Sequence, residues 1–336
     1  MKDSIRLHHH ISKNITKYSD SNYTAKEIQA NIKLHGVYMD GYLYTDRLEK
    51  VFGNEDFSIK HWPQKAKASY EGIEIVWEDK DFMLLFKPYG LPVQEGAGHK
   101  DNNLVNWLLD NVPGQKELKN QKTGENNEIT AGLVHRIDKD TQGLILVAKH
   151  FEALKHGQDQ FRNRFVKKTY LTVISGQLQE EVEVSGFQFR DPRNMLKQVF
   201  IPKNREALIQ KQFKIEQEKI RECLSTFTPL LYDGEKTLCK VRIQTGRMHQ
   251  IRVAAEALGV PIIGDKIYFN QHAKISEIDY SLFEKSPCDI RSIEPKELDT
   301  IINTVFKGHS YYLLSNELIF KDMDDKEIAF KIHDIK

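Results

Sequence analysis

The sequence has little cysteine and no long apolar segment. Its 336 residues include three cysteines, whose spacing fits neither a disulfide framework nor a metal site: Cys223, Cys239 and Cys288. The apolar runs extend over only a few residues, too short to cross a bilayer. The opening stretch, MKDSIRLHHHISK, lacks the apolar region of a secretory signal. We therefore expect a globular protein of the reducing cytoplasm, without a membrane span or a bound metal.

The sequence also lacks an excess of charge of either sign. Its 49 Lys and Arg residues oppose 48 Asp and Glu residues, so the total neither suggests nor excludes a polyanionic partner. The distribution is uneven, because the stretch from Lys149 to Lys168 holds six basic residues and that from Arg190 to Arg205 holds five. Such runs usually form a solvated surface, but these two shift the expectation modestly towards nucleic acid.

Internal repeats and low-complexity tracts are absent, but the first part of the chain differs in character from the rest. Residues 24–44 predict a short helix that stops at Gly36, followed by two strands that turn at Asp40–Gly41. The stretch KHWPQKAKASYEG, residues 60–72, has the composition of a linker. We therefore expect three parts, which are an N-terminal module at 1–60, a linker at 61–72 and a second domain at 73–336.

The second domain is predicted to be rich in strands, with helices between them. The stretch KTYLTVISG alternates Tyr170, Thr172 and Ile174 with residues of the opposite face, as a strand does. Residues 271–308 have weak periodicity and are interpreted as an insertion. The other expected elements are strands at 73–88, 143–149, 237–246, 311–320 and 326–332, and helices at 101–112 (capped by Asp101), 151–165 and 248–259 (ended by Gly259).

One short stretch combines charge with a buried strand. In VHRIDKDTQGLILVAK, Arg136 precedes Asp138 by two residues, directly before the apolar run GLILVAK. An arginine can keep a partly desolvated carboxylate ionised by lowering its pKa, and its planar fork fixes the geometry. A structural salt bridge in a loop would give the same pattern, so the residues alone leave both interpretations open.

Several ordered motifs resemble one family. HRIDKDTQG, residues 135–143, is similar to the catalytic motif of RluA-type pseudouridine synthases. Further segments resemble motifs of that family in the family's order, namely FKPYGLPVQ (86–94), KKTYLTVISG (167–176), RDPRNMLKQV (190–199) and TGRMHQIRVAAEALGVPIIGDKIY (245–268). The resemblance extends over about residues 73–330 and implies an α+β fold, with a mixed, mainly antiparallel central sheet, flanking helices and a central cleft.

The resemblance implies an enzyme that isomerises uridine in RNA to pseudouridine. The reaction breaks the bond between uracil N1 and ribose C1′ and joins C5 to C1′ instead. Because this exchange is neutral in redox and in hydrolysis, it needs no cofactor, and the sequence contains no motif for one. It does need a carboxylate near the glycosidic carbon and a means of extracting the base from its stack.

The resemblance also assigns roles to individual residues. Asp138 is the catalytic carboxylate, acting as nucleophile or as proton acceptor. Arg252 matches the arginine that pairs with it, Tyr170 the tyrosine beside the target base, and Arg136 an arginine associated with base flipping. Further candidates for substrate contact or site support are Lys87, His135, Thr141, Arg247 and Gln250. Three positions depart from the family pattern and leave substrate choice open, which are Gln142, Ala254 and Ser315.

The N-terminal region bears on the choice of RNA. Residues 24–59 resemble the latter half of a small αL RNA-binding module, although an unrelated extension stays possible. With that module, ribosomal RNA is favoured over tRNA as the partner, and binding should weaken as salt rises. We expect a monomer. Two other functions stay open, namely a non-catalytic RNA-binding or assembly protein of the same fold, and a glycosidase or nucleosidase, for which no second carboxylate is evident.

Overall fold

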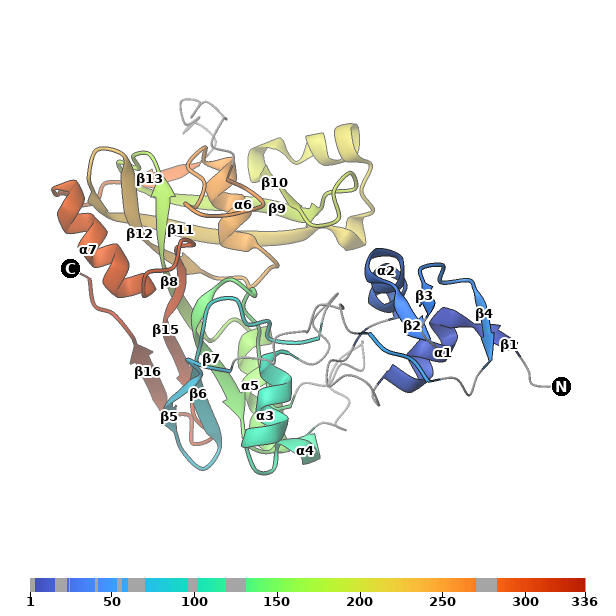
Figure 1. Ribbon diagram of the computed structural model, residues 1–336. Helices are drawn as coiled ribbons and strands as arrows, with labels where there is room; N and C mark the ends of the chain where they lie inside the picture. The colour runs from blue at the N-terminus through green and yellow to red at the C-terminus, as the bar shows by residue number, and fades with distance from the viewer. Residues whose placement is uncertain are drawn as a thin grey trace. The chain divides into compact units, whose positions relative to one another are not determined.

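The computed structural model divides the chain into two compact units (Figure 1), Met1–Ser69 with Glu95–Asn103, and Tyr70–Gln94 with Leu104–Lys336. The division before Tyr70 falls within the predicted linker 61–72, most of which lies outside the described residues, as do the Asp40–Gly41 turn and Asp101. The structure describes residues 4–15, 23, 25–39, 42–52, 56–59, 70–95, 102–118, 131–269 and 283–335.

The smaller unit has a core formed by two short amphipathic helices and the strands after them. Leu7 and Ile11 on one helix, and Ile28 and Ile32 on the other, repeat at four-residue spacing and are almost fully buried. The second helix stops at Gly36, whose positive φ of 70° favours glycine, as the sequence predicted. The elements are β1 (Ser4–Arg6), α1 (Leu7–Asn14), α2 (Ala25–His35), β2 (Val37–Met39), β3 (Tyr42–Tyr44) and β4 (Lys50–Phe52).

The larger unit is built on one sheet, in which 12 strands of the described residues take part. The main order is β10-β9-β11-β12-β8-β15-β7-β6-β5, and β13, β14 and β16 pair with β9, β11 and β15. All pairs are antiparallel except β15 with β7 and β11 with β14, so the predicted mixed, mainly antiparallel sheet is confirmed. The strands are β5 (Glu74–Glu78), β6 (Phe82–Lys87), β7 (Gln142–Ala148), β8 (Lys167–Ser175), β9 (Glu181–Arg190), β10 (Gln198–Pro202), β11 (Arg221–Tyr232), β12 (Lys236–Ile243), β13 (Glu284–Ser286), β14 (Arg291–Ser292), β15 (Leu313–Lys321) and β16 (Glu327–Lys331).

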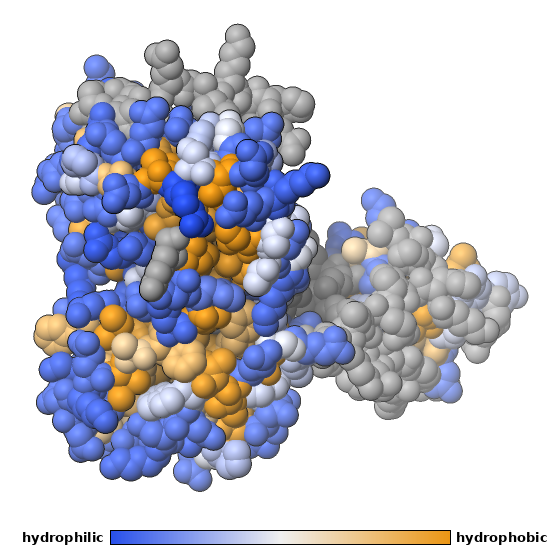
Figure 2. All heavy atoms as spheres, turned by 90° about the vertical axis from the view of Figure 1, so that its left-hand side faces the viewer, coloured by the Kyte–Doolittle hydropathy of each residue, from blue (hydrophilic) through white to orange (hydrophobic). Residues whose placement is uncertain are grey.

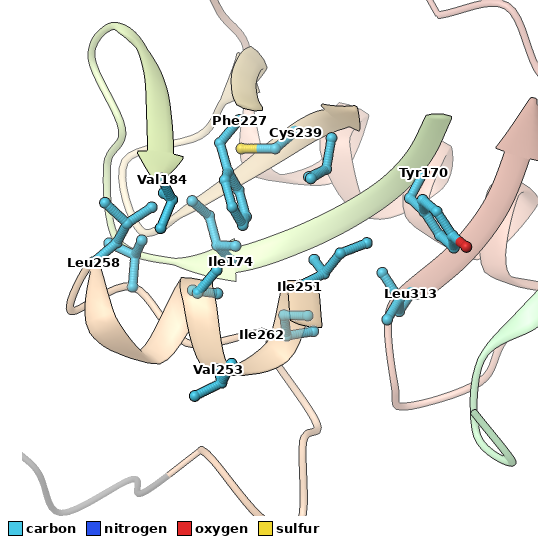
Figure 3. Close-up of a cluster of buried hydrophobic side chains, with 14 of the residues drawn as sticks. Tyr170, Ile174, Val184, Phe227, Cys239, Ile251, Val253, Leu258, Ile262 and Leu313 are labelled. Atoms are coloured by element: carbon cyan, nitrogen blue, oxygen red, sulfur yellow. The ribbon is translucent and has the colours of Figure 1, made fainter. Parts of the chain in front are cut away.

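Helices cover both faces of this sheet. The side chains of β8 alternate between the faces, so Tyr170 and Ile174 pack in the cluster that contains α6, which Figure 3 shows. Leu171 and Val173 pack on the opposite face in the cluster that contains α7. The helices are α3 (Leu104–Asn111), α4 (Gln115–Leu118), α5 (Phe151–Arg162), α6 (Gln250–Ala257) and α7 (Pro295–Phe306), and among the described residues none is long and apolar enough to cross a membrane.

Two regions contain more regular structure than the sequence indicated. Strands β9 to β11 extend one side of the sheet, and three short helical segments connect β10 to β11, at Lys203–Arg205, Ile209–Phe213 and Gln217–Lys219. The segment 271–308 contains α7, which buries Leu298, Ile302 and Val305 against the sheet. The described part of this segment therefore contributes to the core. Figure 2 views the molecule from the side where α7 lies, and apolar side chains there are interrupted by hydrophilic ones.

Candidate active site

The loop that carries Asp138 runs directly into β7, near the centre of the sheet. Asp138 lies in a turn closed by a 3.1 Å hydrogen bond from the Thr141 amide to the Asp138 carbonyl. The neighbouring Ile137 is buried, whereas the Asp138 side chain is 24% exposed. The loop therefore anchors itself with one side chain and presents the next, a carboxylate, to solvent.

Lys87 supports this loop through hydrogen bonds to backbone carbonyls. Its fully buried ammonium donates hydrogen bonds to the carbonyls of Pro88 (2.9 Å), Leu91 (2.7 Å) and Lys139 (2.9 Å). Burial lowers the pKa of Lys87 to about 7, although the nearby Asp140 and Asp138 oppose the shift. Lys87 is not among the residues that line the hollow above Asp138, so the structure places it in the supporting role, one of the two that the sequence left open.

A hollow of about 310 Å³ brings most of the predicted site residues together. Asp138 and Thr141 border it from the loop before β7, Tyr170 from β8, and Arg252 from α6. Arg136, Arg247 and Gln250 also line it. Residues 138, 170 and 252, which are far apart in the sequence, therefore line one hollow.

Arg252 is firmly held in this hollow. Its Nε and Nη2 donate to the two carboxylate oxygens of Asp265 at 2.7 and 2.8 Å, while Nη1 reaches Asp138 Oδ2 at 3.4 Å. The guanidinium carbon also lies 5.2 Å from the ring centre of Tyr268 and 5.7 Å from that of Tyr311. Arg252 is thus fixed by a two-bond pair with Asp265 and contacts Asp138 through its remaining edge.

Asp265 is itself fully enclosed. Its side chain has 0% exposure, and its Oδ1 also accepts hydrogen bonds from the backbone amides of Ile267 (2.8 Å) and Tyr268 (3.0 Å). Burial opposes ionisation, but the hydrogen bonds and charge of Arg252 hold the pKa of Asp265 below its usual value. The same pair raises the pKa of Arg252 above its ordinary value despite burial, so both groups are charged at neutral pH.

His249 lies near the same carboxylate oxygen of Asp138 that Arg252 contacts. Its Nε2 is 4.0 Å from Asp138 Oδ2, and its Nδ1 is 3.0 Å from the Tyr268 hydroxyl, which accepts a hydrogen bond from the Gln198 amide. Donation of the Tyr268 proton to Nδ1 satisfies all of these groups and leaves the imidazole proton on Nε2, facing Asp138. Burial lowers the pKa of His249, which favours the neutral ring.

Tyr170 closes the apolar side of the hollow. Figure 3 shows its ring at the edge of the α6 cluster, near Leu313. Burial raises the pKa of its hydroxyl well above the ordinary value, although a hydrogen bond with the Ser315 side chain opposes this shift. Ser315 lies directly opposite Tyr170 on β15, and its hydroxyl also donates to the Leu144 carbonyl at 3.1 Å. Ser315, one of the three positions that depart from the family pattern, is therefore in contact with Tyr170.

Arg136 and His135, two further predicted residues, differ in whether the protein holds their side chains in place. Arg136 is exposed and contacts Gln94 at 3.3 Å, so it can move towards a ligand. His135 accepts a hydrogen bond from the Leu146 amide at 2.9 Å, and burial followed by the charge of Lys168 lowers its pKa to about 3. His135 is therefore neutral and held in place.

Gln250 is committed to the protein as well. Its amide donates to the Leu224 carbonyl and the Ser225 hydroxyl, and accepts from the Thr245 hydroxyl and the Arg247 amide. These four bonds use its hydrogen-bonding groups. Gln250 therefore shapes the turn before α6.

Sequence reasoning did not single out Asp265, Tyr268 or Tyr311. The first two lie in the segment GDKIY, which formed part of a family-like motif, so a signal for them existed. Tyr311 lies outside every quoted motif, and only the fold brings its ring to Arg252.

The fold and this arrangement of residues define a class, and comparison with known proteins agrees. The family model described as RNA pseudouridylate synthase matches residues 81–257. The chain therefore belongs to the RNA pseudouridylate synthase family, as the motifs predicted. Within that family it is an RluA-type pseudouridine synthase, an isomerase that acts on RNA.

Individual relatives and a solved structure are similar to this chain over most of its length. It is 27% identical over 334 residues to the ribosomal large subunit pseudouridine synthase D of Borreliella burgdorferi, with 95% of each chain covered. It is 32% identical over 240 residues to the protein of the same name from Xylella fastidiosa, covering 70% of this chain and 64% of that one. The structure of human RNA pseudouridylate synthase domain containing 1 shares the fold, with a TM-score of 0.53 and 20% identity over 80% of this chain and 86% of that one.

Proposed function

We propose that the protein converts specific uridines of large-subunit ribosomal RNA to pseudouridine, with Asp138 as the catalytic carboxylate. The observation that carries this proposal is the arrangement of Asp138, Tyr170 and Arg252 around one hollow, with Asp138 Oδ2 at 3.4 Å from the arginine. The choice of ribosomal RNA is supported by relatives that are named large-subunit enzymes and match this chain at 27% and 32% identity.

In the proposed reaction, the target nucleotide leaves its stack and its base enters the hollow beside Tyr170. The Asp138 carboxylate faces the sugar, where it attacks as a nucleophile or accepts a proton, while the N1–C1′ bond breaks. After the uracil turns, C5 bonds to C1′, and on the nucleophilic route this step breaks the bond between C1′ and Asp138 and frees the carboxylate. The C5 proton then leaves, and N1 gains a proton. The reaction is balanced without an oxidant, a metal or a second substrate, so we expect no cofactor.

The surrounding residues have distinct tasks in this proposal. Arg252 is kept in a fixed orientation by Asp265, so it offers Asp138 one hydrogen bond and leaves the carboxylate partly free. Tyr170 gives the extracted pyrimidine a ring to stack on. The exposed Arg136 fills the space that the base leaves, which offsets part of the few kcal/mol that unstacking costs.

The partner and location follow the same proposal. The helix, glycine and strand order of the smaller unit is compatible with an αL RNA-binding module, which would add affinity for structured RNA. We expect the enzyme to act as a monomer in the cytoplasm, where a ribosomal RNA substrate is present.

Release of tritium tests the proposal directly. Large-subunit ribosomal RNA transcribed with uridine labelled by tritium at C5 should release the label to water with the wild type and not with Asp138→Asn. Loss of label by the Asp138→Asn variant at the wild-type rate would refute the role of Asp138. Accumulation of free uracil would instead indicate a glycosidase, and binding without release from any RNA would indicate a non-catalytic protein.

The same assay decides between RNA classes. Transfer RNA prepared with the same label is the alternative substrate, and it should release no tritium if ribosomal RNA is the target. Mapping pseudouridines in both RNA classes from cells that lack the gene would identify the modified uridine. Loss of a pseudouridine from tRNA alone would overturn the ribosomal assignment.

A further inference from the structure

A second hollow, of about 500 Å³, lies beside the candidate active site and is here called the basic hollow. None of the described residues that line it is an aspartate or a glutamate. Those that carry positive charge are Arg136, Arg162, Arg164, Lys168 and Arg247. Positive groups gathered in this way repel one another, so an anion bound among them would be stabilised.

Four of these five cations form no ion pair among the described residues, and one of the four, Arg136, contacts the side-chain amide of Gln94. Of the other three, Lys168 Nζ donates to the Thr245 carbonyl at 3.5 Å, and Arg247 Nε donates to the Glu222 backbone carbonyl at 3.2 Å. Arg164 is exposed. By contrast, Arg162 forms an ion pair with Asp159. Arg164, Lys168 and Arg247 are thus available to a ligand.

Burial and neighbouring positive charge lower the pKa of two of these groups, Lys168 and Arg247. Burial, followed by the charges of Arg247 and Arg164, lowers the pKa of Lys168 to about 8. Burial and the nearby arginines also lower the pKa of Arg247. A bound anion would reverse both effects, because it compensates the charge that the cations now direct at one another.

Two uncharged rings also line the basic hollow, those of His135 and Phe161. They stack with centres 4.4 Å apart, and Lys168 Nζ lies 5.6 Å from the Phe161 ring centre. Because His135 is neutral, the two rings add no charge to the hollow. A lining of cations and uncharged rings suits a phosphodiester with its attached ribose.

The two hollows adjoin, since Arg136, Tyr170 and Arg247 line both of them. A ribose held at Asp138 carries its phosphates on either side, so one of them must enter a neighbouring space. We propose that Arg164, Lys168 and Arg247 form a phosphate site for the phosphodiester next to the target uridine. This inference rests on the proposed function, because it assumes that the uridine of an RNA chain occupies the first hollow.

The purely basic lining ends beyond this hollow. The next hollow also includes Arg164 and Lys168, but it mixes both signs of charge, since Lys167, Arg242 and Lys285 line it together with Glu181, Glu183, Glu284 and Glu317. Glu181 pairs with Arg242 there at 3.5 Å. The basic hollow is therefore the better place for a phosphodiester.

Charge removal tests the site through its salt dependence. We would measure filter binding of large-subunit ribosomal RNA transcripts to the full chain over a series of salt concentrations. Lys168→Gln and Arg164→Gln should each weaken binding and reduce the slope of log Kd against log salt by about 1. The control is Lys296→Gln on α7, which is exposed and lines none of the hollows described above.

The pH dependence separates Lys168 from a general basic surface. A phosphate should bind the protonated lysine, so wild-type affinity should fall as the pH rises from about 7 through the pKa of about 8. Lys168→Arg stays charged over this range and should keep its affinity. The charged and titratable groups that share the basic hollow with Lys168 are His135, Arg136, Arg162, Arg164, Tyr170 and Arg247. Those that share the next hollow with it are Arg164, Lys167, Arg242, Lys285, Glu181, Glu183, Glu284 and Glu317.

The outcomes distinguish this inference from the proposed function. If the wild type releases tritium, but Lys168→Gln and Arg164→Gln keep its Kd and salt slope, the phosphate site is refuted and the function stands. An equal effect of Lys296→Gln would also refute it, since any surface lysine would then suffice. If RNA binds with the expected slopes but no tritium is released, the phosphate site stands and the proposed catalysis fails.

Discussion

The Asp265–Arg252–Asp138 arrangement makes a prediction about a residue that need not touch the substrate. In Asp265→Asn, Arg252 loses the carboxylate that binds it through two hydrogen bonds, at 2.7 and 2.8 Å. Breaking a buried ion pair costs about 3–5 kcal/mol. Because Asp138 still lies 3.4 Å from the guanidinium, we expect a smaller loss of about 2–4 kcal/mol in the free energy of unfolding. That corresponds to a decrease in Tm of roughly 5–15 °C.

The effect on catalysis follows from the charge that Arg252 retains. The freed guanidinium should turn towards Asp138 and pair with it more closely, which misaligns the carboxylate. If this costs about 1.5–3 kcal/mol in the transition state, kcat falls about 10- to 100-fold. The KM for RNA should stay near the wild-type value, because no proposed RNA contact is removed.

Tritium release at saturating RNA and thermal unfolding measure the two effects separately. Asp233→Asn is a matched control, since Lys236 lies between Asp233 (2.8 Å) and Asp299 (3.1 Å) as Arg252 lies between its two aspartates. The control should lose stability without losing kcat. An Asp265→Asn variant with wild-type kcat per folded molecule would refute the positioning role. So would an equal loss of kcat in both variants, which would show that instability alone explains the effect.

Three further predictions concern the loop and the sheet. Lys87→Met leaves three carbonyls without their ammonium donor, of which the Leu91 carbonyl is buried, so urea unfolding should show a loss of about 2–4 kcal/mol and tritium release should slow. In Gly143→Ala, a Cβ would lie 2.3 Å from the Ser315 carbonyl oxygen at φ of 108°, and calorimetry should show a loss of about 2–5 kcal/mol; an unchanged Tm would contradict the close approach of β7 and β15. The hydrogen bond to Asp81 raises the pKa of His150, so this pair contributes stability that is fully present below the unfolded pKa of about 6.5 and is lost as pH rises through the folded value. In His150→Gln that dependence of unfolding on pH should disappear.

Much of the larger unit could be predicted from local patterns. The alternation around Tyr170 predicted β8 and the separation of its two faces, which pack against different helices. Gly259, with φ of 77°, follows α6 closely, as expected of a residue that stops a helix. These predictions succeeded because periodicity and helix ends depend on neighbours in sequence.

Strands β9 to β11 were not predicted, although EVEVSGFQFR does alternate. Gly186 interrupts the pattern of β9, and Pro229 lies within β11, where the register with β12 shifts. Glycine and proline lower the expectation of a strand from sequence, while the fold tolerates them through close strand approach and local irregularity. The close approach is real at Gly186, where a Cβ would lie 2.3 Å from the Ile201 carbonyl oxygen.

The candidate site, too, could be predicted only in part from the sequence. Motif resemblance identified residues 138, 170 and 252, and the structure gathers them around one hollow. The motif resemblance could not show that Arg252 is bound chiefly by Asp265, because this contact depends on the turn after α6, which brings Asp265 back to the helix. Nor could it show that the Lys87 ammonium is enclosed by carbonyls, since a lysine in a loop motif is equally suited to binding phosphate.

The position of β15 has a consequence for the timing of synthesis. This strand, Leu313–Lys321, lies between β8 and β7, so it joins the strand that bears the tyrosine to the strand that follows the aspartate loop. On the ribosome, a nascent chain therefore cannot complete the reaction centre until these late residues have emerged. A polypeptide that ends before β15 would carry Asp138 and Tyr170 without the strand that joins β7 to β8.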